Sequence, residues 1–292
     1  MDSATNLPDL PTELERVIFE MVAEDDLQDG LRLSFVAKRV REWVEPIIYR
    51  RLVVYRTKWH THDAELKLKP AVFPFKRTVD LAQLQTMRFA RHVHTLYVAN
   101  ITVLELSTLL TACTRISELG MSECVLDSSV LGLINARKLS RLSVGGKEDY
   151  FATSFNFPSR ALTATLTHLD LTSERVPTGT LARFTRLTHL CFFAEHVAPE
   201  ESWRESVFAT LPQLKILLQI SSVAVVQHAR RLPPVCDDPR FIALAPPRSR
   251  YFPKGRLYVA HGCWEAAERI VEERAAKSKK TEKIPMLTSV TT

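Results

Sequence analysis

The sequence predicts a mixed α/β fold, in which an N-terminal domain of three short helices is followed by a solenoid of strand–helix repeats. Two patterns support this fold class. Apolar residues have helical spacing in the first fifty residues, and a short apolar motif recurs six times from residue 93 onward. The chain has 292 residues, of which 46% are hydrophobic and 25% charged, so an ordinary globular core is expected.

The first helix is predicted to begin after Pro11. Its apolar residues fall at offsets of 0, 3, 4, 7 and 8, which is the spacing of one helix face (Leu14, Val17, Ile18, Met21 and Val22). Thr12 and Glu15 have the spacing of a capping box, in which each side chain binds a free backbone N–H group of the first turn. The acidic residues 23–30 are interpreted as a turn, because they lack the alternating oxygen ligands of a calcium loop.

A second helical stripe follows, formed by Leu33, Val36, Ala37, Val40 and Val44. Pro46 is expected to end that helix and to begin a third short one over residues 46–52. Three helices in about 45 residues bury too little surface to be stable alone. Because no metal-ligand cluster lies here, the remaining apolar surface must contact either the rest of the chain or another protein.

These residues resemble an F-box domain, in the variant common in a large set of fungal proteins. The resemblance covers about a sixth of the chain. Val40 stands where many F-boxes have tryptophan, and Ile48–Tyr49 stand where many have a Leu–Trp pair. The matching elements are the Leu10–Pro11 pair, the helix with Leu14 and Ile18, the segment LSFVAKRVREW (33–43) and the segment IIYRRLVV (47–54).

The resemblance implies a non-enzymatic adaptor. F-box proteins dock onto a Skp-family linker protein of a cullin–RING ubiquitin ligase, while a downstream domain captures a protein substrate. Such an adaptor acts by proximity, because it makes the encounter of substrate and conjugating enzyme effectively intramolecular. The alternative is a scaffold whose N-terminal helices only cap its own repeats, with no ubiquitin-ligase role. The resemblance assigns linker docking to Leu10, Pro11, Leu14, Ile18, Leu33, Val36 and Val40.

The repeated motif reads apolar-x-x-Leu-x-apolar. Its copies begin at residues 93, 116, 139, 166 and 187, and a sixth begins at residue 214. The fourth-position leucines are separated by 23, 23, 27, 21 and 27 residues, within the period of leucine-rich repeats (Leu96, Leu119, Leu142, Leu169, Leu190 and Leu217). Gln219 takes a position that should be apolar, so the sixth strand is expected either to slip in register or to end the array.

The segments between the motifs have helical spacing, notably at residues 101–113, 125–136 and 178–184. One strand and one helix per repeat predict an irregular leucine-rich-repeat solenoid with parallel strands on its concave face. Residues 50–56 and 77–82 are candidates for further strands that join the helices to the array. Repeats of this irregular kind resemble those that often follow F-boxes in the same fungal set.

We therefore expect an F-box-like domain and a repeat domain, followed by a C-terminal cap. In the cap, residues 255–260 are predicted as a strand. Residues 263–277 are predicted as an amphipathic helix whose apolar side includes Trp264, Ala267, Ile270 and Val271 and covers the last repeat. The expected boundaries are 1–6 (disordered N-terminus), 7–52 (F-box-like), 53–226 (solenoid), 227–276 (cap) and 277–292 (basic disordered tail).

Substrate binding is predicted on the concave face, at the strand residues that lie between the apolar positions. These side chains are a mixture of aromatic, basic and acidic groups. Because they do not form a row of like charges, a protein ligand is favoured over nucleic acid. The sequence does not identify that substrate. The predicted binding residues are Tyr97, Glu118, Arg141, His168, Asp170 and His189.

No catalytic residue, metal site or cofactor is predicted. The histidines in residues 60–62 and 92–94 provide zinc half-sites without a second pair at ligand spacing. His168 and His189 take the same position in successive repeats, near Asp170, and repeat equivalence explains that coincidence. A zinc hydrolase built on this histidine column is a third reading, which metal analysis would test.

The protein is expected to be soluble and to reside in the cytoplasm, the nucleus or both. Its five cysteines form no CxxC pair, the N-terminus has no signal sequence, and no apolar run is long enough to cross a membrane. The formal net charge of +6 comes partly from residues 277–283, which are interpreted as a solvated terminus and not as a binding site for nucleic acid or lipid.

Overall fold

The computed structural model describes residues 10–55, 71–72, 88–145, 159–171, 176–194, 201–221, 238–244 and 259–282. The chain forms two compact units, Met1–Glu118 and Leu119–Thr292. Both alternate helices with parallel strands, so the predicted mixed α/β class is confirmed. Within the described ranges, no helix has both the length and the apolar character that crossing a membrane requires.

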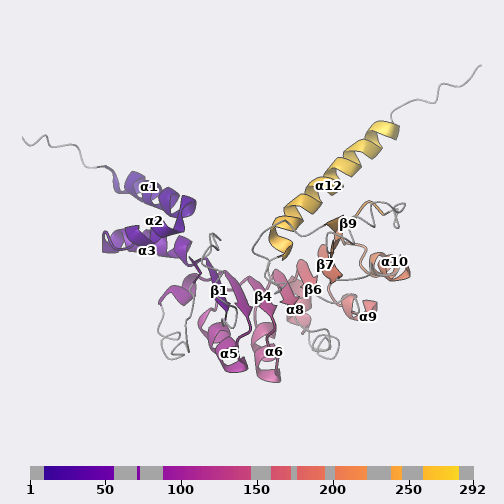
Figure 1. Cartoon of the computed structure of the whole chain (residues 1–292), viewed down its shortest axis with the longest axis horizontal. Coiled ribbons are helices and arrows are strands. Elements are labelled where there is room, and N and C mark those ends of the chain that lie inside the picture. The colour runs from indigo at the N-terminus through magenta and orange to yellow at the C-terminus, as the bar shows by residue number, and fades with distance from the viewer. Residues whose placement is uncertain are drawn as a thin grey trace, which may run out of the picture. The chain divides into compact units, whose positions relative to one another are not determined.

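The first unit begins with three helices that contact one another and form a bundle (Figure 1). They are followed by parallel strands: β1 pairs with β2 on one side and with β3 on the other. The elements of this unit are α1 (Thr12–Asp25), α2 (Leu27–Leu33), α3 (Lys38–Ile48), β1 (Arg51–Tyr55), β2 (Ala71–Val72), the 3-10 helix η2 (Arg88–His92), β3 (Thr95–Ala99) and α5 (Val103–Ala112).

The N-terminal domain has three helices, as predicted, but only α1 and α3 correspond to predicted helices. Residues 27–33 are helical and not a turn, because Asp26 caps α2 by accepting a hydrogen bond from the backbone N–H of Gln28. Pro46 does not end α3, since it lies in the last turn and the helix continues to Ile48. The predicted third helix over residues 46–52 is therefore wrong, and β1 begins at Arg51.

The predicted capping box of α1 is also wrong. Pro11 occupies the N-cap, and its carbonyl oxygen accepts hydrogen bonds from the N–H groups of Leu14 and Glu15. Thr12 is the first helical residue, and Glu15 instead forms an ion pair with Arg39 of α3 at 2.7 Å. A capping box does occur at α5, where Thr102 and Glu105 bind each other's backbone N–H groups.

The core of the three-helix bundle comes mainly from α3. Val40, Val44 and Ile48 lie one turn apart on its buried side, and Ala23 of α1 completes the cluster. The bundle is joined to the following strands through the end of α3, because Tyr49 stacks on Phe89 of η2 with ring centroids 4.7 Å apart.

The second unit repeats a strand–helix pattern. Its parallel strands β5 to β9 pair in sequence order, and from β5 to β8 the paired residues take equivalent positions in successive repeats. Its elements are β4 (Glu118–Ser122, whose first residue ends the first unit), α6 (Ser128–Asn135), β5 (Arg141–Gly145), α8 (Arg160–Thr165), β6 (His168–Leu171), α9 (Thr178–Leu181), β7 (His189–Ala194), α10 (Glu201–Thr210), β8 (Ile216–Ser221), β9 (Phe241–Leu244) and α12 (Val259–Glu282).

All six strands predicted from the repeated motif are present. In each, the strand begins at the third residue of the motif, and the fourth-position leucine is buried (Leu96, Leu119, Leu142, Leu169, Leu190 and Leu217). Gln219 is buried too, and it stays paired with Phe192 of β7. The register therefore does not slip at Gln219. The sheet continues past this strand, because β9 pairs with β8, but β9 does not carry the repeated motif.

The C-terminal part of the chain differs from the prediction. β9 lies in a proline-rich region where no strand was expected. Val259 and Ala260 belong to α12, so the strand predicted for residues 255–260 is wrong at that end, and residues 255–258 lie outside the described ranges. The helix also continues to Glu282, through residues expected in a disordered tail. The predicted strand at residues 77–82 is outside the described ranges as well.

Helix α12 lies across one face of the second unit's strands, opposite the side that carries α9 and α10 (Figure 1). The alternation of side chains along β7 shows this directly: Phe192 contacts Trp203 of α10, whereas His189 contacts Trp264 of α12. The predicted apolar side of α12 is confirmed, since Trp264 and Ala267 are buried and Ile270 and Val271 pack against the same cluster.

Candidate functional site

The first candidate site is an apolar surface on α1. Leu14 is 53% exposed and Ile18 is 50% exposed, in a helix where only Ala23 is buried. Phe35 and Val36, in the turn between α2 and α3, are more exposed still. We call the following residues the α1 surface: Leu10, Leu14, Val17, Ile18, Met21 and Val22.

The sequence of α1 explains why its apolar side is exposed. The side that faces α3 is the row Glu15, Phe19 and Ala23, which are four residues apart and so lie one above another. Leu14 and Ile18 precede that row by one residue, which turns them about 100° away around the helix. An ion pair, an aromatic contact and a small residue therefore attach α1 to the bundle, and the larger aliphatic side chains are left outside.

The residues predicted to bind a linker protein divide into two groups. Leu10, Pro11, Leu14, Ile18 and Val36 are exposed. Val40 is only 1% exposed and belongs to the bundle core, and Leu33 is partly buried against that core. Val40 thus cannot contact a partner, because its side chain already faces Ala23 and Val44.

The predicted concave-face residues also differ in accessibility. Tyr97 and Glu118 in the first unit are partly exposed, and so are Arg141 and His168 in the second. Glu118 accepts a hydrogen bond from the Thr95 hydroxyl at 3.2 Å. Asp170 and His189, in contrast, are buried. Helix α12 covers His189, so the accessible part of the predicted binding face is smaller than the strands alone suggest.

Sequence reasoning missed the contacts of α12 with this face. The signal was the run Ile216–Ile220 in β8, which is apolar on both sides of the strand except at Gln219. A strand with two apolar faces is covered on both. The buried cluster on the α12 side contains Cys191, Ile216, Leu218, Ile220, Ile242, Cys263, Trp264 and Ala267.

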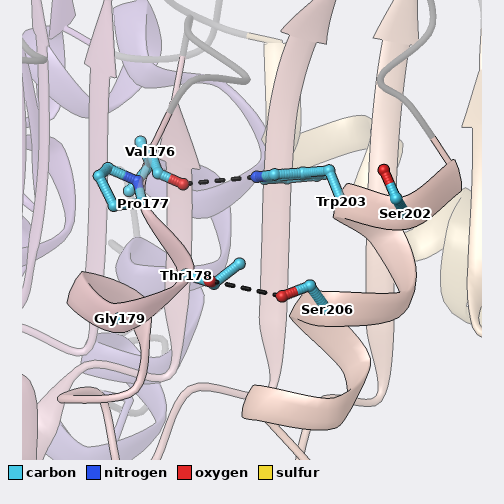
Figure 2. A pocket seen from close by; sticks show the side chains of 7 residues that line it. All are labelled: Val176, Pro177, Thr178, Gly179, Ser202, Trp203 and Ser206. Atoms are coloured by element: carbon cyan, nitrogen blue, oxygen red, sulfur yellow. Dashed lines mark hydrogen bonds between the residues drawn. The ribbon is translucent and has the colours of Figure 1, made fainter.

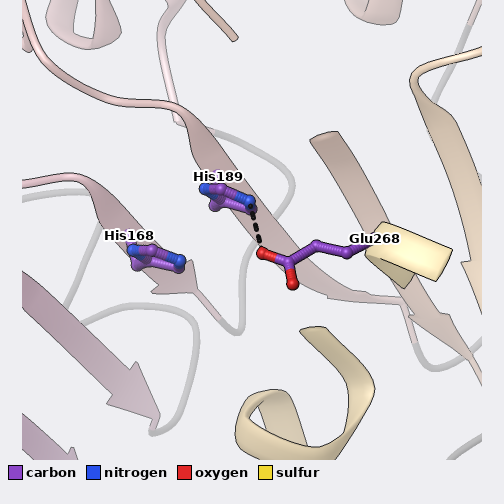
Figure 3. Close-up of side chains that lie close together, drawn as sticks. All are labelled: His168, His189 and Glu268. Carbon is purple, nitrogen blue, oxygen red and sulfur yellow. Dashed lines mark ion pairs between the residues drawn. The ribbon is translucent and has the colours of Figure 1, made fainter. Parts of the chain in front are cut away.

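Two histidines and a carboxylate meet at the edge of that cluster (Figure 3). His168 and His189 are paired in register on β6 and β7, and their rings are stacked with centroids 4.1 Å apart. Glu268 of α12 approaches from the opposite element, and its Oε1 lies 3.3 Å from Nε2 of His189. The indole of Trp264 contacts both rings edge-on, at centroid distances of 5.6 and 5.2 Å.

The surroundings keep His189 neutral. Burial, together with the nearby charges of Lys215 and Arg141, lowers its pKa to about 4. Burial also raises the pKa of two thiols beside it: that of Cys191 lies well above its ordinary value, and that of Cys263 is about 11, with the carboxylate of Asp170 adding to both shifts. Both cysteines are therefore protonated at neutral pH and are poor nucleophiles.

The histidine pair predicted as a zinc half-site at residues 92–94 does not form one. His92 ends the 3-10 helix η2, and its Nε2 accepts a hydrogen bond from Arg91 at 3.0 Å. His94 lies just before β3, so the two residues do not share a strand face. Residues 60–62 lie outside the described ranges.

A pocket of about 470 Å³ lies where the start of α9 meets α10 (Figure 2). Trp203 donates a hydrogen bond to the carbonyl oxygen of Val176 at 3.4 Å, and Ser206 donates one to the hydroxyl of Thr178 at the same distance. The two hydrogen bonds join the start of α9 to α10. The pocket is lined by residues without charged side chains (Val176, Pro177, Thr178, Gly179, Ser202, Trp203 and Ser206).

No protein-family model matches the chain, and no curated protein matches it either.

Proposed function

We propose that this protein is a substrate-recognition adaptor of a Skp–cullin–F-box type ubiquitin ligase. In this proposal the three-helix bundle is an F-box-like domain, and the strand–helix repeats form an irregular leucine-rich-repeat solenoid. The bundle binds a Skp-family linker protein, and through it a cullin–RING ligase. The repeats bind a protein substrate, and the chain itself performs no chemistry.

The observation that carries the proposal is the α1 surface. A bundle of three helices has room for one small core, and here α3 supplies most of it. Six aliphatic side chains in or just before α1 remain in contact with solvent (Leu10, Leu14, Val17, Ile18, Met21 and Val22). An exposed apolar patch of this kind is typical of a protein-binding surface.

The position of the α1 surface also supports an adaptor. The bundle contacts the following strands through α3 and η2, by the stacking of Tyr49 on Phe89. Helix α1 contacts α2 and α3, which leaves its aliphatic side available for another protein. The resemblance of these same residues to an F-box supports a Skp-family linker protein as that partner.

The adaptor mechanism requires two binding surfaces on one chain. The second surface is proposed at the accessible strand residues of each unit, which are Tyr97 and Glu118 in the first unit and Arg141 and His168 in the second. When both surfaces are occupied, a substrate lysine is held near the conjugating enzyme at a high effective concentration. The ubiquitin transfer itself belongs to the assembled ligase.

The second candidate is a leucine-rich-repeat scaffold whose helices only cap its own repeats. The stacking of Tyr49 on Phe89 favours it, since the bundle does pack on its own chain through α3. The two candidates differ at α1: only the adaptor needs the α1 surface for binding. Substitutions there separate them.

The test is affinity purification of the full chain from its native cells, with the Skp-family linker and a cullin as the measured partners. Two double variants remove docking residues: Leu10→Ala with Pro11→Ala, and Leu14→Ser with Ile18→Ser. The matched control is Leu104→Ser with Val125→Ser, which changes exposed aliphatic residues outside the bundle. Circular dichroism checks that each variant keeps its helices.

We expect both docking variants to lose at least tenfold in recovered linker protein, and the control to recover it like the wild type. Recovery of the linker at the wild-type level by both docking variants would overturn the assignment of this surface. Absence of any linker from the wild-type purification would favour the scaffold.

A further inference from the structure

The side chains of His168, His189 and Glu268 lie close enough to share one metal ion. One ligand atom from each residue lies within 4.8 Å of the other two. The three residues come from three separate elements: β6, β7 and α12. Figure 3 shows the carboxylate of Glu268 directed at the ring edges of the two stacked histidines. We propose that this cluster is a zinc site that fastens α12 to the strands.

The hydrogen bonds behind the histidines direct their Nε2 atoms toward the metal position. Nδ1 of His168 lies 3.0 Å from the hydroxyl of Thr167, and Nδ1 of His189 lies 2.8 Å from the hydroxyl of Thr188. Each hydroxyl also donates a hydrogen bond to a backbone carbonyl oxygen, that of Ser140 or Thr167. A hydroxyl that donates its one proton to the carbonyl oxygen accepts from Nδ1–H, and in that tautomer Nε2 carries the lone pair.

This arrangement is the one found around metal-binding histidines, whose second nitrogen is held by a hydrogen-bond acceptor. It occurs twice because Thr167 and Thr188 take equivalent positions in successive repeats, as the two histidines do. Repeat equivalence therefore accounts for the stacking. It does not account for Glu268, which comes from a helix outside the repeat pattern.

In this tautomer the contact of Glu268 with His189 also points to a cation. With Nδ1 of His189 protonated, its Nε2 and the carboxylate Oε1 are both hydrogen-bond acceptors, and they lie only 3.3 Å apart. Two acceptors at this distance repel each other unless a proton or a metal ion lies between them. Tetrahedral zinc with bonds of about 2.0 to 2.1 Å places its ligand atoms about 3.3 Å apart, which this pair already satisfies.

The third ligand, His168, can reach the same ion with small movements of its side chain. The two rings are parallel, within 5°, so His168 must tilt for its lone pair to converge with that of His189. His168 is only partly buried, and the Glu268 side chain is 48% exposed, so both have room to adjust. The indole of Trp264 holds the more buried His189 in place from its edge.

The ligand set selects zinc among the common cations. Two imidazole nitrogens and one carboxylate oxygen suit Zn²⁺, whereas Mg²⁺ and Ca²⁺ take oxygen ligands almost exclusively. Three protein ligands leave a fourth position for water or for a side chain of a bound protein. The site lies on the strand face that carries the predicted substrate-binding residues, but it does not depend on the adaptor function.

The experiment is zinc titration of the full chain after chelator treatment, followed by calorimetry and by the visible absorption of Co²⁺ as a substitute ion. The test variants are Glu268→Gln and His168→Gln. Both positions are partly or largely exposed, so their loss does not remove the core. The control is Glu273→Gln, an exposed carboxylate on the same helix about 140° away around its axis.

We expect one zinc ion per chain, with affinity at least tenfold weaker in both test variants and unchanged in the control. Bound zinc is also expected to raise the thermal midpoint of the wild type, and to do so less in Glu268→Gln. Absence of stoichiometric zinc binding would overturn the proposal, and would mean that the threonine hydroxyls donate to Nδ1 while His189 donates to Glu268. Zinc binding of wild-type strength in both test variants would overturn it equally, by placing the ion elsewhere.

Discussion

Gly30 of α2 lies directly against Ala23 of α1: a Cβ atom added to Gly30 would be 3.0 Å from the Ala23 Cβ and 3.1 Å from its Cα. The same atom would lie 3.3 Å from Cγ1 of Ile48. The three helices of the bundle therefore meet at a point where one of them has no side chain. This close approach lets so small a unit bury a continuous core.

We predict that Gly30→Ala destabilises the protein, whereas Gly132→Ala stabilises it. Alanine favours a helix interior over glycine by about 1 kcal/mol, and Gly132 in α6 has open space around its Cβ position. At Gly30 the added methyl group must displace the backbone of α1, and such overpacking costs about 1 to 3 kcal/mol. The expected net change for Gly30→Ala is a loss of about 1 kcal/mol in the free energy of unfolding.

Urea denaturation followed by circular dichroism measures both variants. Equal gains in stability for the two substitutions would show that α1 and α2 do not approach each other as described. Gly30→Val adds a check, because its larger, β-branched side chain increases the overlap and is expected to be more destabilising than Gly30→Ala.

Substitutions in the α1 surface are predicted to leave the fold intact. Leu14→Ser and Ile18→Ser remove side chains that are half exposed, so each should change the free energy of unfolding by less than about 1 kcal/mol. Val40→Ala removes two methyl groups from the bundle core and should cost about 1 to 3 kcal/mol. Thermal and urea denaturation of the purified variants measure the difference. A loss at Leu14 or Ile18 as large as that at Val40 would mean that α1 buries its aliphatic side in the protein's own core.

The contrast between Leu14 and Val40 shows what the sequence can predict about the docking surface. Periodicity identified both residues as helical and apolar, and both were assigned to linker binding. Periodicity does not say which element faces which side of a helix. The orientation of α1 depends on its ion pair between Glu15 and Arg39 and on the contact of Phe19 with Trp43, which join residues far apart in the sequence.

The repeats were predictable because each depends on local spacing. Leu190 is buried in its strand, and its register partner Leu217 is buried at the same position of the next unit. Helix α12 and strand β9 have no such repetition. The contact of Glu268 with His189 joins residues from distant parts of the chain, and no pattern in either segment indicates it.

The stability of the metal-free protein is predicted to fall as the pH is lowered from about 6.5 toward about 4. His189 has an ordinary pKa of 6.5 when exposed, and burial beside Lys215 and Arg141 lowers its pKa to about 4 in the folded protein. Between these values the unfolded chain binds a proton that the folded chain does not. Protonation therefore favours unfolding, at a rate of about 1 kcal/mol per pH unit.

The groups that face His189 set the sign of this effect. His168 stacks on one side of the ring and Trp264 covers its edge, so neither supplies negative charge. Glu268 does, but it is half exposed to solvent, and its carboxylate is screened more than the buried ring is. The cost of burying a charged imidazole thus exceeds the attraction of Glu268, and the contribution to stability is complete above pH 6.5.

Urea denaturation in the presence of a chelator at pH 5, 6 and 7 measures this dependence, and His189→Gln is the matched variant. Its absolute stability is expected to be lower, since the ring fills a buried position, but its stability should change less between pH 7 and pH 5 than that of the wild type. A wild-type stability that rises as the pH falls through this window would mean that His189 is charged in the folded protein and pairs with Glu268. An unchanged slope in His189→Gln would assign the pH dependence to other groups.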